Sequence, residues 1–380
     1  MKIFSIHFVI TSLLIYQIDG YAPILSRLFR LKDKLPSASL LQYPKLDYTE
    51  LTGQEKYDLQ WYVIARSDEI LSDKPYPVQI WDNKYVVWKS ESGEYSALDD
   101  ACAHKGASLS AGKVCNGNVV CPYHGYEFNT NGTLVNVPGI CFRPSPVYNL
   151  NKYNIVERGG WLYLNTMTTN VLQDNSSFTS DANIYVEPEI DMDCSVVHLD
   201  MEYKCYSRIL SENSLDIMHI AFVHTFGNSK KPEPIREEPP VKIGPNHYRS
   251  TYFYEAGEQS LARKVFGIKE LTVENEFILP HTTIARIIFG QYVNTVITFA
   301  LPVGEEKSRL FVKTYRNFWQ NPMGDMFTKN SMLTTMLQDK AIVESIDSRF
   351  MDGKFNMKFD KLQNTYVAFY KRFVHLIDKN

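Results

Sequence analysis

Several features are scarce in this sequence, and each scarcity excludes a class of protein. Six cysteines occur in 380 residues without an obvious pairing pattern, which argues against a scaffold held by disulfides. The formal net charge is −3, so there is no electrostatic case for binding nucleic acid. No GxGxxG stretch or flavin-binding fingerprint is present. With 44% hydrophobic residues, the chain can bury one large core or two modest ones, which predicts a soluble globular protein of two domains.

One marked apolar stretch, FVITSLLIY, stands within residues 1–20. It is too short to span a bilayer but long enough for the core of a signal peptide. A tyrosine, Ala-Pro and four basic residues follow, ending at Lys34. This order resembles the two-part plastid-targeting presequences of algae whose plastids have extra membranes. We therefore expect residues 1–34 to be a targeting presequence, and ordinary secretion is the alternative.

Residues 205–224, CYSRILSENSLDIMHIAFVH, place an amide, a carboxylate and two imidazoles within about three helical turns. Asn213, Asp216 and His219 recur at intervals of three residues, which predicts roughly one side of a helix. His224 follows five residues later and would point away unless the helix is broken or bulged there. Two imidazoles and one remote carboxylate would form the facial triad that binds non-haem Fe(II). A buried amphipathic helix with two structural histidines is the alternative.

Two pairs of cysteine and histidine stand about a hundred residues upstream. CAHKGASL contains Cys102 and His104, and CPYHGYEF contains Cys121 and His124. Each pair lies in a Gly-containing turn, which lets two thiolates hold one iron and two imidazoles hold the other in a Rieske [2Fe–2S] centre. A structural zinc site is the alternative, but its usual order is two cysteines followed by two histidines.

Together, these motifs resemble the signature of the Rieske non-haem iron oxygenases, which is CxH, about sixteen residues, CxxH and later NxxDxxHxxxxH. The resemblance covers roughly residues 58–350, and its wording is most similar to the branch of pheophorbide a oxygenase and chlorophyllide a oxygenase. It implies an α+β chain with an all-β Rieske [2Fe–2S] domain at residues 58–165. A catalytic domain at residues 184–380 would follow, with an antiparallel sheet wrapped around a long helix in a helix-grip (START-like) fold. The implied cofactors are the cluster and one mononuclear Fe(II).

The pattern of short runs agrees with that order. WYVIA, PVQIW and YVVWK predict strands, with a hairpin turn at residues 82–84. Residues 165–183 are polar and predict an inter-domain linker. The Pro-rich stretch KKPEPIREEPP is interpreted as a surface loop or lid. At least four strand-like runs occur in residues 247–319, and helical periodicity begins at about Phe327.

The resemblance places the third iron ligand, a carboxylate, on this late helix. In MLQDKAIVESID the candidates are Asp339, Glu344 and Asp347. We choose Asp339 because family members carry the ligand in a similar Gln-Asp or Glu-Asp context. In the family, Asp216 is not a ligand but bridges a cluster histidine and an iron histidine across two subunits, which implies a homotrimer. Asn213 is expected to shape the iron pocket.

Other positions have weaker implications. Respiratory Rieske proteins carry two further cysteines and a serine where this chain has Ala107, Tyr123 and Tyr126. Fewer hydrogen bonds to sulfur predict a lower reduction potential, which suits dioxygen chemistry. The histidines outside the motifs are interpreted as structural or surface residues: His7, His198, His247, His281 and His375.

Without a flavin fingerprint, electrons must come from a separate protein, and the resemblance implies a ferredoxin, with or without its reductase. The other partners would be dioxygen and a flat apolar molecule. The branch, the plastid-like presequence and the aromatic residues of the C-terminal half favour a chlorophyll-derived tetrapyrrole. Those aromatic residues are Phe253, Tyr254, Phe277, Phe289, Tyr292 and Phe299.

Several alternatives stay open. The substrate could instead be a sterol or a small alkaloid, and the chain could be a Rieske electron carrier or a binding protein without oxygenase activity. An iron–sulfur cluster is hard to rationalise in a secreted protein, which favours the plastid over secretion. The chain has no CxxC, so the thioredoxin control seen in plastid members of the branch is not expected. Peripheral association with a membrane stays open.

Overall fold

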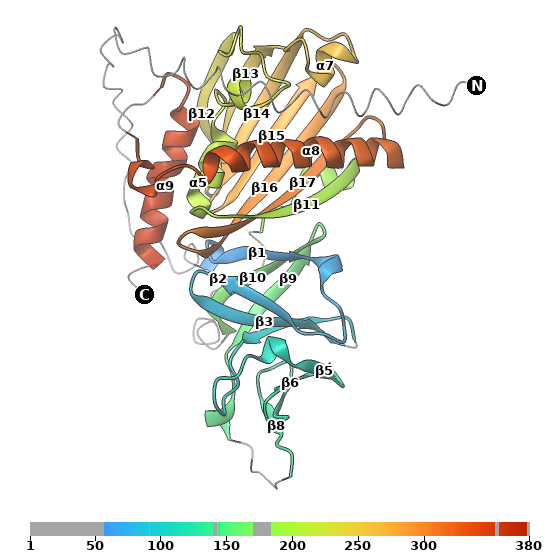
Figure 1. Ribbon diagram of the computed structural model, residues 1–380, viewed down its shortest axis with the longest axis vertical. Coiled ribbons are helices and arrows are strands. Elements are labelled where there is room, and N and C mark those ends of the chain that lie inside the picture. Colours follow the sequence, from blue (N-terminus) through green and yellow to red (C-terminus); the bar gives the residue numbers. More distant parts are fainter. Residues whose placement is uncertain are drawn as a thin grey trace, which may run out of the picture. The chain divides into compact units, whose positions relative to one another are not determined.

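The computed structural model describes residues 57–377, apart from residues 91, 140–142, 144, 170–183 and 354–356. The expected presequence and most of the expected linker therefore lie outside the described residues. Three antiparallel sheets form the framework of the described chain, and a few helices accompany the largest of them (Figure 1). None of the described helices is long and apolar enough to cross a membrane.

A six-stranded sheet has the strand order β1-β10-β9-β4-β3-β2. Its strands are β1 (Trp61–Arg66), β2 (Tyr76–Ile80), β3 (Asn83–Lys89), β4 (Tyr95–Asp99), β9 (Lys152–Arg158) and β10 (Trp161–Thr168). The predicted hairpin is confirmed, but its turn lies slightly earlier than expected. Ile80 pairs with Asn83, so Trp81 and Asp82 form the turn, and Trp81 adopts a positive φ of 52°.

A small four-stranded sheet follows strand β4 in the chain. Its strands are β5 (Lys113–Cys115), β6 (Asn118–Val120), β7 (Glu127–Phe128) and β8 (Leu134–Asn136). Successive side chains of a strand point to opposite faces, and β3 uses both faces. Val86 and Trp88 pack with the small sheet, whereas Tyr85 and Val87 face the core shared with the largest sheet. The six-stranded sheet therefore lies between the other two sheets.

The largest sheet has seven strands in the order β11-β17-β16-β15-β14-β13-β12. They are β11 (Ser195–Tyr203), β12 (Arg236–Gly244), β13 (His247–Glu255), β14 (Glu270–Ile278), β15 (Thr282–Phe289), β16 (Tyr292–Gly304) and β17 (Lys307–Arg316). The four predicted runs correspond to β13, β14, β16 and β17, and the sheet adds β11, β12 and β15. The Pro-rich stretch is thus only partly a loop. Its last prolines, Pro239 and Pro240, lie in edge strand β12 where the pairing register shifts between Glu238 and Val241, a position that tolerates proline.

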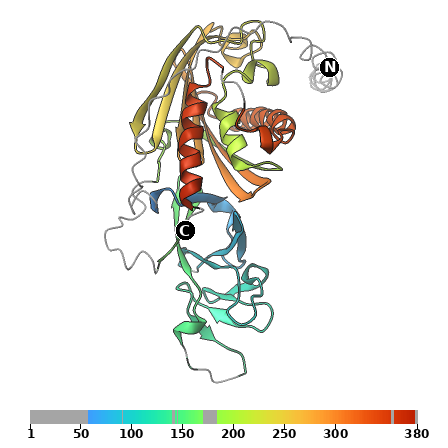
Figure 2. The same cartoon turned by 90° about the vertical axis from the view of Figure 1, so that its left-hand side faces the viewer.

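Five α-helices are described: α5 (Ser207–Leu215), α6 (Ile220–Val223), α7 (Leu261–Lys264), α8 (Pro322–Val343) and α9 (Lys361–Ile377). Helix α8 begins earlier than predicted, because the Asn321 side chain caps it and Pro322 occupies its first turn. It lies across one face of the seven-stranded sheet and is seen nearly end-on in Figure 2.

Strand β17 shows how the two faces of the large sheet are used. Leu310 and Val312 pack with buried residues of α5 and α8. On the opposite face, Phe311 and Tyr315 belong to the core shared with the six-stranded sheet. On that face too, Arg309 donates to the Tyr76 hydroxyl at 2.7 Å, which ties the two sheets together. The helices and the six-stranded sheet therefore cover opposite faces of the large sheet.

Candidate metal centres

Two loops carry the paired cysteines and histidines. One, residues 102–107, follows β4, and the other, residues 121–126, joins β6 to β7. In both loops the cysteine amide donates to the carbonyl five residues later, at 2.9 and 2.8 Å, and the glycine amide donates back to the cysteine carbonyl. Gly106 and Gly125 have φ values of 70° and 73°, which residues with a Cβ adopt rarely. The two loops thus share one hydrogen-bond pattern although their Cys–His spacings differ.

The four side chains form an inner and an outer pair. Cys102 and Cys121 are buried, and burial raises the pKa of the Cys102 thiol to about 11, although the backbone amides of His104 and Lys105 oppose this shift. His104 and His124 are exposed, and their Nδ1 atoms lie 3.2 Å apart. Two buried thiols beside two imidazoles whose Nδ1 atoms converge are the donors that a Rieske cluster requires, so the residues present fit this group.

Aromatic rings contact both imidazoles. Tyr126 stacks on His104 with 4.9 Å between ring centroids and 7° between the ring planes. The Tyr123 ring is 3.8 Å from that of His124 and is 62% exposed. Two of the three positions that differ from respiratory Rieske proteins thus place aromatic rings against the histidines. The lower reduction potential stays a prediction.

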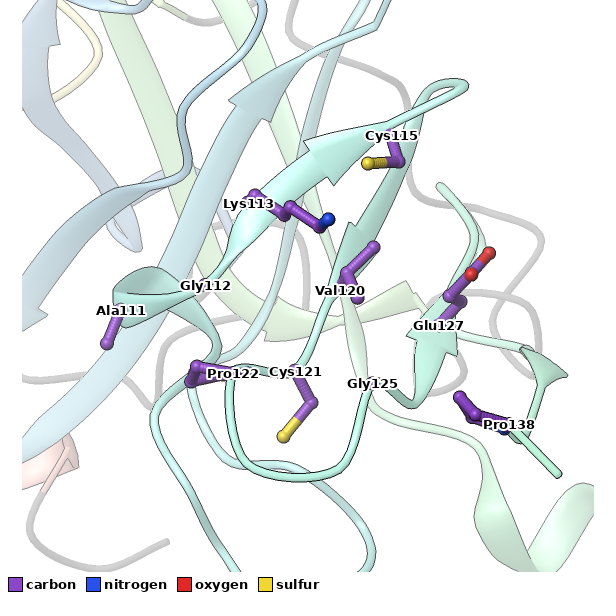
Figure 3. A pocket seen from close by; sticks show the side chains of 10 residues that line it. All are labelled: Ala111, Gly112, Lys113, Cys115, Val120, Cys121, Pro122, Gly125, Glu127 and Pro138. Atoms are coloured by element: carbon purple, nitrogen blue, oxygen red, sulfur yellow. The ribbon is translucent and has the colours of Figure 1, made fainter.

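A hollow of about 500 Å³ borders the second loop (Figure 3). Its lining includes Cys115, Cys121 and Lys113. Figure 3 shows the Cys121 side chain directed away from Cys115, so the Cys115 thiol is not one of the converging donors. Every lining residue belongs to residues 111–138, so the hollow is not part of the candidate iron site on the large sheet. All five described cysteines are free thiols, and Cys141 lies outside the described residues.

The stretch at residues 205–224 is two helices rather than one. Helix α5 ends at Leu215, and Asp216 has an extended backbone. The Asp216 Oδ1 atom accepts hydrogen bonds from the amides of Met218 (2.7 Å) and His219 (3.3 Å), so this side chain begins the next helical turn. The prediction of one helix face shared by Asn213, Asp216 and His219 is therefore wrong. This break precedes both histidines, which flank the short helix α6, and the backbone of His224 is extended where that helix ends.

Helix α8 brings a carboxylate to these histidines. The Nε2 atoms of His219 and His224 lie 3.2 Å apart, and Asp339 Oδ1 lies 3.5 and 3.3 Å from them. This Oδ1 atom is buried and has no hydrogen-bond partner among the described residues. Burial lowers the pKa of His219 to about 4, opposed by the charge of Asp339, so the imidazole is neutral near pH 7. Two imidazole nitrogens and a buried oxygen without a hydrogen-bond partner among the described residues fit a ferrous ion in a facial triad.

The other two carboxylate candidates make different contacts. Glu344 Oε1 accepts a hydrogen bond from the backbone amide of Lys204 at 2.7 Å. The Asp347 side chain accepts from the Arg349 amide at 3.0 Å and caps a short 3-10 helix. Of the three candidates, the structure brings Asp339 to the histidines.

Three residues surround the triad. Asp216 Oδ2 lies 3.9 Å from His219 Nδ1, and burial raises the pKa of this carboxyl, opposed by the amides it caps. The other two were not anticipated: Gln338 Oε1 lies 3.0 Å from His224 Nδ1, and Phe226 stacks on the His224 ring. Gln338 could have been found from the sequence, because it directly precedes the chosen ligand Asp339. Asn213 lies in the last turn of α5, where its carbonyl accepts from the Asp216 amide. Its expected role in the pocket stays a prediction.

The histidines outside the motifs have structural surroundings where they are described. His247 pairs with the buried Glu276 at 2.6 Å. Burial lowers the pKa of His198 to about 4 and that of His281, which is fully buried, to about 3. His7 and the side chain of His375 lie outside the description.

The aromatic residues expected to suit a flat substrate do not share one site. Phe277 packs with α9, Phe299 lies in the core between the sheets, and Phe289 packs with Tyr292 in another cluster. Only Tyr254 belongs to the cluster that contains Met218, next to the histidine turn. The aromatic support for a flat substrate was therefore wrong, because strand pairing distributes these residues over both faces of the sheet.

Two family models match consecutive parts of the chain. The Rieske [2Fe-2S] domain matches residues 60–148, and the vanillate O-demethylase oxygenase C-terminal domain matches residues 203–373. The first includes all four cluster candidates, and the second includes the whole triad.

Three curated relatives each match less than half of this chain. Chlorophyllide a oxygenase of Chlamydomonas reinhardtii is 30% identical over 168 residues, which are 43% of this chain and 24% of the relative. The vanillate O-demethylase oxygenase subunit of a Pseudomonas strain is 30% identical over 45% of this chain and 46% of its own. The dicamba O-demethylase oxygenase component of Stenotrophomonas maltophilia is 33% identical over 43% and 46%. The matches thus span a quarter to a half of these relatives.

Solved structures match more of the chain. Dicamba monooxygenase bound to dicamba superposes with a TM-score of 0.73 at 20% identity, over 85% of this chain and 99% of that one. NdmA of Pseudomonas putida with theobromine gives a TM-score of 0.67 at 19% identity, over 84% and 91%. These likenesses confirm the expected α+β fold, with a Rieske domain followed by a sheet-rich domain with few helices.

Proposed function

Because the chain belongs to the Rieske non-haem iron oxygenases, we propose that it oxygenates an apolar small molecule with dioxygen and electrons from a ferredoxin-like protein. The convergence of His219, His224 and Asp339 on one point supports this most directly. An electron carrier would need only the Cys/His loops, so the assembled triad counts against that rival. When bound, the cluster supplies one electron at a time and the mononuclear iron supplies dioxygen activation.

The residues of the loops have separate tasks in this proposal. Cys102 and Cys121 would hold the inner iron, shielded from water, and the exposed His104 and His124 would hold the outer iron. The imidazole edge is therefore the side at which electrons enter and leave. Its exposure suits contact with another protein surface.

The bridge to the iron site requires a second subunit. Within one chain, the six- and seven-stranded sheets lie between the Cys/His loops and the helices that carry the triad. Packed layers are about 10 Å apart, so the separation is on the order of 30 Å. A cluster histidine therefore cannot hydrogen-bond Asp216 of the same chain. Asp216 is 32% exposed, and its Oδ2 atom, which accepts no backbone amide, is left for such a histidine from a neighbour. A closed ring, most simply a homotrimer, would supply every bridge.

Metal analysis tests the core of the proposal. We expect three irons and two acid-labile sulfides per chain after anaerobic purification, with a Rieske-type EPR signal after reduction by dithionite. Zinc near one per chain, without mixed Cys/His ligation in the spectrum, would overturn the cluster assignment.

Subunit mixing tests the bridge. A Cys121→Ala subunit lacks a cluster ligand, and a His219→Ala subunit lacks an iron ligand, so neither should turn over alone. Co-expressed mixed rings should recover part of the wild-type activity, because an intact cluster would face an intact iron site. If rings that are shown to contain both variant subunits are as inactive as each variant alone, electron transfer between subunits is contradicted.

For the substrate we propose a chlorophyll-derived tetrapyrrole, and for the location the plastid. Support comes from the branch-like motifs and from chloroplastic chlorophyllide a oxygenases of an alga and two plants at 25–30% identity. The second candidate is O-demethylation of a methoxylated aromatic acid. The match of the vanillate O-demethylase C-terminal domain to residues 203–373 favours it.

One panel separates these substrates. The reduced protein, a plant-type ferredoxin and its reductase would be incubated under ¹⁸O-labelled dioxygen with pheophorbide a, chlorophyllide a, protochlorophyllide, vanillate and cholesterol. We expect label in a tetrapyrrole. Label in cholesterol alone, or formaldehyde release from vanillate alone, would defeat the tetrapyrrole and leave the oxygenase reading intact.

A further inference from the structure

The two nitrogens of the His224 ring face different groups. Nε2 faces the triad, with His219 Nε2 at 3.2 Å and Asp339 Oδ1 at 3.3 Å. Nδ1 faces the side-chain oxygen of Gln338 at 3.0 Å, which is ordinary hydrogen-bond length. A neutral imidazole carries its proton on one nitrogen and its lone pair on the other. Because an amide oxygen can only accept, this contact requires the proton on Nδ1 and leaves the lone pair on Nε2.

We propose that Gln338 is a positioning residue that holds His224 in the tautomer and rotation needed to bind the mononuclear iron through Nε2. This rests on the proposed function of the triad and assigns a role to a residue beside it. If the amide were reversed, its NH₂ group would donate to Nδ1 and place the proton on Nε2, which would block the ligand lone pair.

The second histidine shows what Gln338 adds. His219 Nδ1 is buried, lies 3.9 Å from Asp216 Oδ2, and has no hydrogen-bond partner among the described residues. That distance is too long for a hydrogen bond. Within one chain, the ring of His224 is therefore oriented by a hydrogen bond. The ring of His219 would be oriented only after a neighbouring subunit completes the Asp216 bridge.

Two further contacts make the orientation rigid. Phe226 stacks on the His224 ring at 5.1 Å with 14° between planes, which sets the plane of the ring, while the Gln338 contact sets its rotation. Helix α8 is anchored one turn from the ligand, where the Tyr203 hydroxyl donates to the Met336 carbonyl at 3.2 Å. Consecutive residues of α8 thus supply one ligand, Asp339, and the group that orients another.

The test measures how firmly iron is held, independently of turnover. Gln338→Leu removes the acceptor with little change in size, and Gln338→Glu retains an acceptor. Thr334→Val, on the exposed face one turn earlier, is the matched control. Each full-length protein would be loaded with Fe(II), and the release of mononuclear iron to a ferrous chelator would be followed, with the cluster absorbance as an internal reference.

We expect Gln338→Leu to lose mononuclear iron about 10 to 100 times faster than wild type, because groups that orient metal-bound histidines have effects of this size. Gln338→Glu and Thr334→Val should stay within about threefold of wild type, and the EPR signal of the nitric oxide adduct should change only in Gln338→Leu. If Gln338→Leu does not fold, Gln338→Met, which keeps the chain length, replaces it.

The outcomes separate the two levels. If wild-type protein holds mononuclear iron and the leucine or methionine variant releases it at the wild-type rate, the proposed role of Gln338 is wrong. The proposed function of the triad would stand. Equal acceleration in Gln338→Leu and Gln338→Glu also overturns it, because the acceptor would not matter. Wild-type protein that holds no mononuclear iron overturns the proposed function and this role with it.

Discussion

The two candidate metal centres of this chain are built in opposite ways. In the Cys/His loops, each cysteine has its histidine within three residues, and a repeated backbone hydrogen-bond pattern shapes both turns. In the triad, two ligands flank a short helix and the third comes from α8, with six strands of the large sheet between them in the chain. The comparison shows that local chain geometry can preform a loop site, whereas the triad exists only once the sheet and its helices have packed.

The largest expected effect follows from removing a ligand in a loop. Cys121→Ala should abolish the cluster and its colour, lowering iron from three to about one per chain, because the inner iron would be left with the single thiolate of Cys102. Iron and sulfide analysis measures this. Cys115→Ala is the matched control and should retain the cluster. If the cluster is retained in Cys121→Ala and lost in Cys115→Ala, the cluster ligand is Cys115 and not Cys121.

The reciprocal change should remove one iron. Asp339→Ala deletes the only oxygen of the triad, so mononuclear iron should be lost while the cluster absorbance stays at the wild-type level. Glu344→Gln and Asp347→Asn serve as controls, since both carboxylates are held by other contacts, and both variants should keep three irons. Iron loss in Glu344→Gln instead would assign the ligand to Glu344.

A change between the two sites should affect turnover alone. Asp216→Asn keeps the oxygen that caps the histidine turn and removes the charge, so both metals should stay bound while turnover falls by about 100-fold or more. Iron content and substrate turnover measure the two effects separately. Normal turnover would contradict the bridge between the sites.

The smallest effect is expected at the join between the sheets. His281 has a folded pKa of about 3, against about 6.5 when unfolded, because it is buried. The fold therefore keeps its full stability above pH 6.5, where this imidazole is unprotonated in both states, and it loses stability as the pH falls towards 3. Between pH 7 and pH 5 this residue should lower the free energy of unfolding by about 2 kcal/mol, and His281→Phe should remove that loss. Urea unfolding at both values measures it.

Tyr370, whose ring lies against His281, provides the control for this experiment. Burial raises the pKa of its hydroxyl well above the ordinary value, so the group is neutral at both pH values. Tyr370→Phe should therefore change stability equally at pH 7 and pH 5. An unchanged acid dependence in His281→Phe would show that other groups cause it.

The loop site and the type of fold could be predicted from the residues alone. The spacings Cys102-x-His104 and Cys121-x-x-His124 act over one turn of backbone, so the printed residues suffice to predict a cluster. Alternating apolar residues likewise predicted the hairpin of β2 and β3 and four strands of the large sheet, because strand periodicity is a local property.

The second site, in contrast, is assembled by tertiary packing. The five-residue step to His224 indicated a broken or bulged helix, but it did not indicate a break at Asp216, whose side chain caps a new turn. Asp339, Glu344 and Asp347 all offer a carboxylate; the resemblance favoured Asp339, and the packing of α8 on the sheet brings Asp339 to the two histidines. Gln338 acquires its partner 114 residues away in the same manner. Contacts between distant segments depend on how whole layers pack, which local periodicity does not encode.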